Sequence, residues 1–163
     1  AIFSGICNGI SPIISFNYGA NNKDRINKIL KIAISTIIII GISSTILMIF
    51  GGETLIKMFS KGDAELIRIT AEATKLYSVA FVFNGLNILT SAYFTALEDA
   101  KTSAIISVLR GVILILIFII ILPIILGDIG IWLTVPASEL VTVFIAVNYM
   151  KKADLKIQKM KIA

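Results

Sequence analysis

Residues 102–127 read TSAIISVLRGVILILIFIIILPIILG, and this stretch decides the fold class of the chain. It contains one charge, Arg110. An α-helix needs about 20 mostly apolar residues to cross a hydrocarbon core about 30 Å thick. A central arginine opposes insertion by about 3 kcal/mol, whereas each isoleucine or leucine favours it by about 0.5 kcal/mol. The isoleucines and leucines between Ile113 and Leu122 outweigh Arg110, so the stretch predicts a transmembrane helix.

Four further stretches are apolar and nearly free of charge. They cover residues 1–17, 32–52, 76–97 and 129–150, and within them only Glu139 is charged. The first is short and begins without Met, which indicates a helix whose first turns are missing. We therefore expect an all-α integral membrane protein, a polytopic bundle of one truncated helix and four complete transmembrane helices. Residues 1–150 are predicted to form a partial transmembrane lobe, and residues 151–163 a basic tail.

The composition supports a membrane protein and excludes several other classes. Of the 163 residues, 57% are hydrophobic and 15% are charged, and the mean hydropathy is +0.95. Average soluble domains have about 45–50% apolar and about 25% charged residues. The single cysteine excludes an internal disulfide, and the lack of histidine removes the imidazole from metal binding and acid–base chemistry. We find no nucleophile–base or metal-ligand set, and so expect neither an enzyme nor a cofactor or metal site.

The basic residues predict the orientation in the membrane. Ten Lys and Arg residues lie in segments 18–31, 98–101 and 151–163, whereas four lie in segment 53–75. The excess of basic residues marks the cytoplasmic side, so the first three segments, including the C-terminus, are expected in the cytoplasm. The net charge of +5 belongs to these loops and does not indicate nucleic acid as a partner. Frequent Ile, Lys and Asn are typical of an AT-rich genome and suggest a bacterial plasma membrane.

Residues 64–97 are predicted to form one continuous helix of about 51 Å at 1.5 Å per residue. Gly62 and Asp63 supply a turn and a candidate N-cap before it. Charges of alternating sign follow helical spacing in its first half and predict one solvated stripe with weak ion pairs. The stripe consists of Glu65, Arg68, Glu72 and Lys75.

Polar residues gather on one face of the predicted span 76–97. They include Tyr77, Asn84, Asn87 and Ser91. Lipid cannot satisfy polar side chains at membrane depth, so they face the interior of the bundle or a wet cavity. Hydrogen bonding between helices and lining of a substrate cavity explain this face equally well, and both interpretations stay open.

Two charges are predicted inside the membrane. Arg110 lies about 12 Å and Glu139 about 16 Å from the cytoplasmic ends of their spans at 1.5 Å per residue. Buried charges are tolerated mainly when they are paired or wet. The similar depths favour an Arg110–Glu139 pair or polar network. Participation of Glu139 in proton or cation movement and separate partners for the two residues are the alternatives.

Several motifs occur in one order along most of the chain. The run PIISFNYGA begins at Pro12 and contains Asn17 and Gly19, and AKTSAIISVLR covers residues 100–110. Leu122-Pro123, Gly-Ile-Trp at 130–132 and Val-Pro-Ala-Ser-Glu at 135–139 follow, with Pro136 in the last. Together these motifs resemble those of the multidrug and toxic compound extrusion (MATE) family.

The resemblance implies the C-terminal portion of a twelve-helix exporter: the end of helix eight, then helices nine to twelve. Such exporters expel mainly cationic drugs and metabolites in exchange for H⁺ or Na⁺, using two six-helix lobes around a cavity. The missing N-terminal lobe, the lipid bilayer and small-molecule substrates are then the implied partners. Some members carry an acidic cation ligand in helix ten, but residues 76–97 contain no carboxylate. The coupling acid is therefore expected outside this chain, or is Glu139. Glu98-Asp99 also replaces an expected glycine.

Two other functions remain as alternatives to a secondary active exporter. A lipid-linked oligosaccharide flippase of the same superfamily would be expected to have more cationic residues along its cavity. A non-catalytic membrane anchor or assembly subunit fits the low charge, but it leaves the clustered motifs unexplained.

Overall fold

The computed structural model describes residues 1–60 and 63–159, with side chains up to residue 153. Every regular element in this part of the chain is helical, which confirms the predicted all-α fold. The α-helices are α1 (Ile2–Gly19), α2 (Lys23–Phe59), α3 (Ala64–Ser78), α4 (Ala80–Ala96), α5 (Ala100–Val108), α6 (Leu114–Leu126) and α7 (Asp128–Lys159). A π-helix, η1 (Leu109–Ile113), joins α5 to α6.

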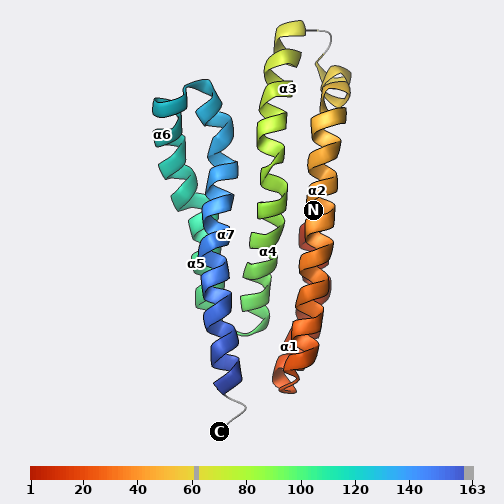
Figure 1. Ribbon diagram of the computed structural model, residues 1–163, viewed down its shortest axis with the longest axis vertical. Helices are drawn as coiled ribbons and strands as arrows, with labels where there is room; N and C mark the ends of the chain where they lie inside the picture. Colours follow the sequence, from red (N-terminus) through yellow and green to blue (C-terminus); the bar gives the residue numbers. More distant parts are fainter. Residues whose placement is uncertain (61–62, 160–163) are drawn as a thin grey trace.

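The helices stand side by side as an elongated bundle (Figure 1). Helix α4 occupies the middle and packs against α1, α2, α5 and α7. One end of the bundle holds the α1–α2 and α4–α5 connections and the last turns of α7; we call it the basic end. The α2–α3 and α6–α7 connections lie at the opposite end. Helix α1 begins about midway along the bundle, where Figure 1 marks the N-terminus.

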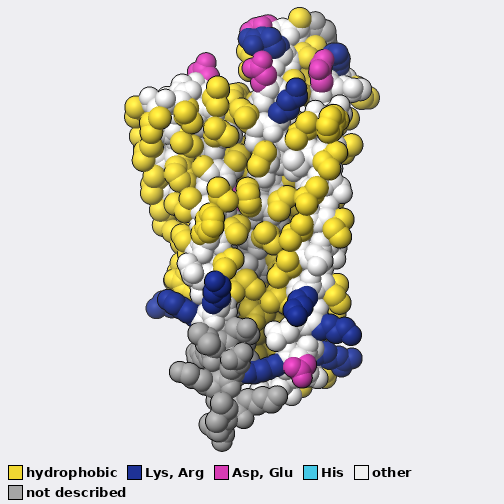
Figure 2. All heavy atoms as spheres, viewed as in Figure 1, with side chains coloured by type: hydrophobic (Ala, Val, Ile, Leu, Met, Phe, Trp, Pro, Cys, Tyr) yellow, Lys and Arg dark blue, Asp and Glu magenta, His cyan; other side chains and the backbone are white. Residues whose placement is uncertain are grey.

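The surface of the bundle matches a membrane environment. Figure 2 shows hydrophobic side chains over the middle, with charged side chains gathered at the two ends. By length and composition, α2, the run from α5 to α6, and α7 are each long and apolar enough to cross a membrane, and the bent pair α3–α4 is a fourth candidate. Helix α1, the first predicted span, is not among them. No residue of α6 is buried within the chain, so its isoleucines are free to contact lipid or another protein segment.

The prediction of one continuous helix over residues 64–97 is wrong. The helix is interrupted at Val79, and the axes of α3 and α4 differ by 43°. Hydroxyl groups lie at the break. Thr45 Oγ1 of α2 lies 2.8 Å from the Ser78 carbonyl oxygen and 2.9 Å from the Gly41 carbonyl oxygen, so its one proton is shared between them, and Ser78 Oγ donates to the Lys75 carbonyl at 2.9 Å. Side chains that insert into the hydrogen-bond ladder of a helix are a common cause of kinks.

The predicted cap and charged stripe of α3 are present. The Asp63 side chain accepts a hydrogen bond from the Leu66 backbone N–H at 3.1 Å. Arg68 pairs with Glu65 at 2.8 Å and with Glu72 at 3.3 Å. The guanidinium holds the pKa of Glu65 below its ordinary value, chiefly through the hydrogen bond. All three side chains are exposed, and exposed pairs contribute little to stability.

Two tight connections shape the ends of the bundle. Between α4 and α5, Glu98 has a φ of 62°, a left-handed conformation that glycine adopts more readily. This explains why the family resemblance leads one to expect glycine there. Between α6 and α7, Gly127 has a φ of 60°, and the buried Gly130 lies against the Leu122 carbonyl.

Candidate functional site

A buried carboxylate forms the centre of a polar network between α4 and α7. Glu139 is 4% exposed. Its Oε1 accepts a hydrogen bond from Asn84 Nδ2 at 2.9 Å, and its Oε2 accepts one from Asn87 Nδ2 at 2.6 Å. The three-residue spacing places both amides on one face of α4. Burying a charge requires such donors, so the amides make this carboxylate tolerable at membrane depth.

Arg110 approaches the same carboxylate from η1. Its Nε lies 3.9 Å from Glu139 Oε1, and its Nη1 donates to the Asn84 carbonyl at 3.4 Å. The structure thus brings the two predicted intramembrane charges together, with Asn84 joining them. Arg110 sits in a π-helix, a distortion often found at functional sites.

Sequence reasoning missed the pairing of Asn84 and Asn87 with Glu139. The available signal was the combination of two amides three residues apart and a single acid in a later span. One atom of the network stays unsatisfied, because Asn87 Oδ1 is buried and has no hydrogen-bond partner among the described residues. An unpaired buried acceptor opposes folding by about 1–3 kcal/mol.

A polar groove of about 540 Å³ runs between α1, α4, α5 and η1. On its wall Ser91 Oγ lies 2.9 Å from Ser107 Oγ, and the buried Ser103 Oγ behind the wall lies 2.8 Å from both Ser91 Oγ and Thr95 Oγ1. Among the described residues that line the groove, Arg110 is the one with a charged side chain. The residues that line it are Ser4, Cys7, Asn8, Ser11, Ile88, Ser91, Ala92, Thr95, Ser107, Arg110 and Gly111.

The four candidate cavity residues do not share one cavity. Ser91 lines the polar groove, whereas Tyr77 and Asn84 line a second hollow of about 430 Å³ whose wall includes residues of α1 and α2. Asn87 is fully buried against Glu139. The expected single stripe is divided because Tyr77 precedes the bend at Val79 and the amide of Asn87 is turned toward α7.

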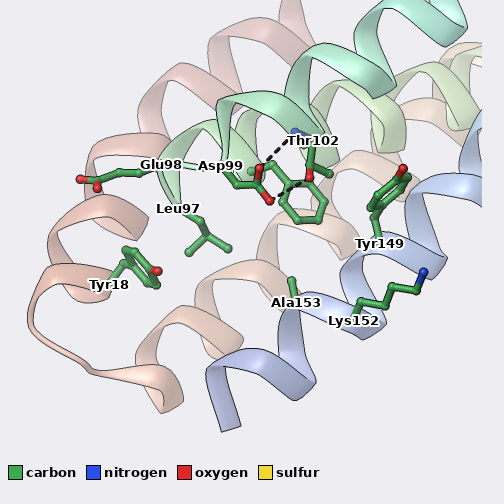
Figure 3. A pocket seen from close by; sticks show the side chains of 9 residues that line it. Tyr18, Leu97, Glu98, Asp99, Thr102, Tyr149, Lys152 and Ala153 are labelled. Atoms are coloured by element: carbon green, nitrogen blue, oxygen red, sulfur yellow. Dashed lines mark hydrogen bonds between the residues drawn. The ribbon is translucent and has the colours of Figure 1, made fainter. Parts of the chain in front are cut away.

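A third hollow, of about 480 Å³, lies at the basic end of the bundle (Figure 3). Of the two acidic residues in its wall, Asp99 caps a helix and Glu98 points away from the hollow. The Asp99 carboxylate accepts hydrogen bonds from the Thr102 backbone N–H and from Thr102 Oγ1, which caps α5, and the Glu98 side chain extends away from the other labelled residues. The remaining wall is largely aromatic and aliphatic, with Tyr18, Phe94, Leu97, Tyr149 and Ala153 beside Lys152.

The motif residues shape helices rather than line the groove. Pro12 lies inside α1 and Pro136 inside α7, three residues before Glu139. Asn17 is buried and donates from Nδ2 to the Ile13 carbonyl at 2.7 Å, which closes the last turn of α1. Gly19 is the last residue of that helix and has open space around its Cα.

Comparison with known proteins places these features in context. A family model described as MatE matches residues 1–121. The multidrug export protein MepA of Staphylococcus saprophyticus is 28% identical over 114 residues, which are 70% of this chain and 25% of that protein. MepA of Staphylococcus aureus strain MSSA476 is 26% identical over the same shares. The chain thus spans about a quarter of the length of these curated relatives.

A solved structure shares the fold. It is described as the outward-facing conformation of a multidrug resistance MATE family transporter of the MOP superfamily. It aligns with a TM-score of 0.86 at 18% identity, over 96% of this chain and 36% of that one. At this identity the likeness concerns the arrangement of helices alone.

Proposed function

Since this chain belongs to the multidrug and toxic compound extrusion (MATE) family, we propose that it forms part of the C-terminal lobe of a secondary active multidrug exporter. Helix α1 is then the end of helix eight, and the four candidate spans are helices nine to twelve. Similarity to export proteins named MepA supports this role.

The polar groove is the observation that carries the proposal. Hydroxyl, amide and guanidinium groups line this groove, although the exterior of the bundle is largely apolar. Its volume of about 540 Å³ falls within the range of about 300–1,000 Å³ typical of small-molecule sites. Transporters of this kind place substrate near the midplane, between two repeats that move against each other. We therefore assign the groove to this lobe's share of the substrate cavity.

The proposed substrates are cationic drugs or metabolites, exchanged for H⁺ or Na⁺. No described residue that lines the groove is acidic, so counter-charges for a cation come from the N-terminal lobe. Both oxygens of Glu139 accept amide N–H groups, and Asn87 also holds a buried oxygen, Oδ1, that has no hydrogen-bond partner among the described residues.

The two alternatives explain less of the structure. A flippase for lipid-linked oligosaccharides would be favoured by several cations along the groove, where the described residues supply Arg110 alone. A role as a membrane anchor or assembly subunit does not explain why polar side chains line the groove.

Narrowing the groove is expected to reduce transport. In the full-length transporter that carries this lobe, Asn8→Leu is expected to lower ethidium efflux from energised vesicles severalfold. Asn8 lines the groove and makes no side-chain hydrogen bond among those described, so its replacement breaks none of them. The matched control is Asn27→Leu, which changes an exposed residue of α2 outside the groove and leaves efflux intact.

The 163-residue chain alone is expected to transport nothing, because alternating access requires both lobes. Efflux by this chain alone would contradict the two-lobe arrangement. Equal efflux by the Asn8→Leu and Asn27→Leu variants would contradict the assignment of the groove to the substrate cavity. Absence of efflux by the folded full-length transporter, across a panel of cationic dyes, would contradict the exporter.

We further propose that the basic end faces the cytoplasm of a bacterial cell. Lys57 lies near the opposite end and Lys28 at the basic end, and both are exposed. In a Cys7→Ser background, a membrane-impermeant maleimide added to intact cells is expected to label Lys57→Cys but not Lys28→Cys. The reverse pattern, or labelling of both positions, would contradict the orientation.

A further inference from the structure

The described wall of the groove carries a positive charge, whereas a cation site requires a negative one. Arg110 is the charged residue among the described groove-lining residues, and the acidic Glu139 lies outside that lining. A group that enters the groove therefore meets a guanidinium and neutral hydroxyl and amide groups. This setting attracts the negative part of a ligand.

The guanidinium of Arg110 has donors to spare. It carries five N–H groups, and the described residues supply one long hydrogen bond, to the Asn84 carbonyl at 3.4 Å. The distance of 3.9 Å between Arg110 Nε and Glu139 Oε1 is too long for a hydrogen bond. The side chain is 21% exposed, so its remaining N–H groups are within reach of the groove.

Glu139 does not depend on Arg110 for its hydrogen bonds. Asn84 and Asn87 already donate to its two oxygens at 2.9 and 2.6 Å. The guanidinium of Arg110, whose N–H groups form a planar fork, can therefore bind a second anion on its groove side. The buried carboxylate keeps its hydrogen bonds when this happens.

Hydroxyl groups line the same groove as the Arg110 guanidinium. Ser107, three residues before Arg110, is exposed in the groove, and its Oγ lies 2.9 Å from Ser91 Oγ. Serine hydroxyls rotate and either donate or accept, so this pair can turn a donor toward an incoming oxygen atom.

We propose that Arg110 and Ser107 form a recognition site for an oxyanion group, a carboxylate or a phosphate, on the transported molecule. The inference rests on the proposed exporter function and predicts that, among its cationic substrates, amphipathic zwitterions bind more tightly than cations without an oxyanion. Arginine binds such planar groups in a bidentate manner, which lysine cannot reproduce.

Two dyes of one skeleton test this site. Rhodamine 110 carries a free carboxylate, and rhodamine 123 is its methyl ester, so the two differ mainly in the oxyanion. Binding to the full-length transporter in phosphatidylcholine nanodiscs is measured by fluorescence polarisation. We expect rhodamine 110 to bind about tenfold more tightly than rhodamine 123, the effect of one charge-assisted hydrogen bond.

Variants of the groove separate charge from shape. Arg110→Gln is expected to weaken rhodamine 110 binding about tenfold and to change rhodamine 123 binding less than twofold. Arg110→Lys retains the charge without the fork and is expected to fall between. Arg68→Gln removes an exposed arginine outside the groove and serves as the matched control. If Arg110→Gln does not fold, the wild-type comparison of the two dyes and the Arg110→Lys variant still decide the result.

Equal binding of both dyes, or preference for the ester, would overturn the oxyanion site, while continued ethidium efflux would leave the exporter function standing. Equal weakening of both dyes by Arg110→Gln would also overturn it. Repeating the measurement in dodecyl maltoside micelles, which contain no phosphate, distinguishes the source of the oxyanion. Tighter binding of rhodamine 110 in the micelles than in the nanodiscs identifies lipid phosphate as a competing ligand, and equal binding identifies the oxyanion of a solute.

Discussion

Replacing Glu139 by alanine is expected to lower the free energy of unfolding by about 3–5 kcal/mol, the usual effect of breaking a buried ion pair from one side. The substitution leaves the amides of Asn84 and Asn87 without their shared acceptor and removes the opposite charge that lies 3.9 Å from Arg110 Nε. Reversible unfolding in mixed micelles, followed by fluorescence of the single tryptophan, Trp132, measures the loss.

Double-mutant cycles divide this effect among the partners. Asn87 Nδ2 lies 2.6 Å from the carboxylate, whereas Arg110 Nε lies 3.9 Å away. We therefore expect Glu139→Ala to couple more strongly with Asn87→Ala than with Arg110→Ala, although both double mutants should lose less than the sum of the single mutants. Strict additivity in both cycles would show that Glu139 acts independently of these partners. A stronger coupling with Arg110 would contradict the order of distances.

Much of the architecture follows from hydropathy alone. Long apolar runs have one stable form in lipid, the helix, so all-α structure and the approximate positions of helices were predictable from residues such as those between Ile113 and Leu122. The N-cap at Asp63 and the ion pairs of Arg68 depend on near neighbours in sequence, which makes them readable as well.

The features that escaped prediction depend on distant parts of the chain. The bend at Val79 is held by Thr45, which lies 33 residues before the Ser78 carbonyl that it contacts. The division of the polar face of residues 77–91 depends on which neighbour each side chain meets, and Asn87 meets Glu139 across 52 residues. Helical periodicity identifies a face, but it does not say which helix packs against it.

Replacing Gly130 by alanine is expected to be the second damaging change, with a loss of about 3 kcal/mol in the free energy of unfolding. A Cβ at this position would overlap the Leu122 carbonyl and lie 2.6 Å from the Pro123 nitrogen. These are backbone atoms, so no rotation of a side chain relieves the overlap. Helix α6 packs mainly against η1 and α7, and separating it from α7 removes most of its contacts within the chain.

The same substitution at Gly51 is the control, because its Cβ would meet nothing closer than Leu47 Cδ1 at 3.8 Å. Alanine favours a helix over glycine by up to about 1 kcal/mol, so Gly51→Ala is expected to raise stability slightly. The intrinsic gain is similar at both positions, and the difference between the two variants therefore isolates the overlap at the α6–α7 hairpin. If both variants shifted stability by the same amount in the same direction, the close approach of Gly130 to Leu122 would be wrong, and α6 would sit farther from α7.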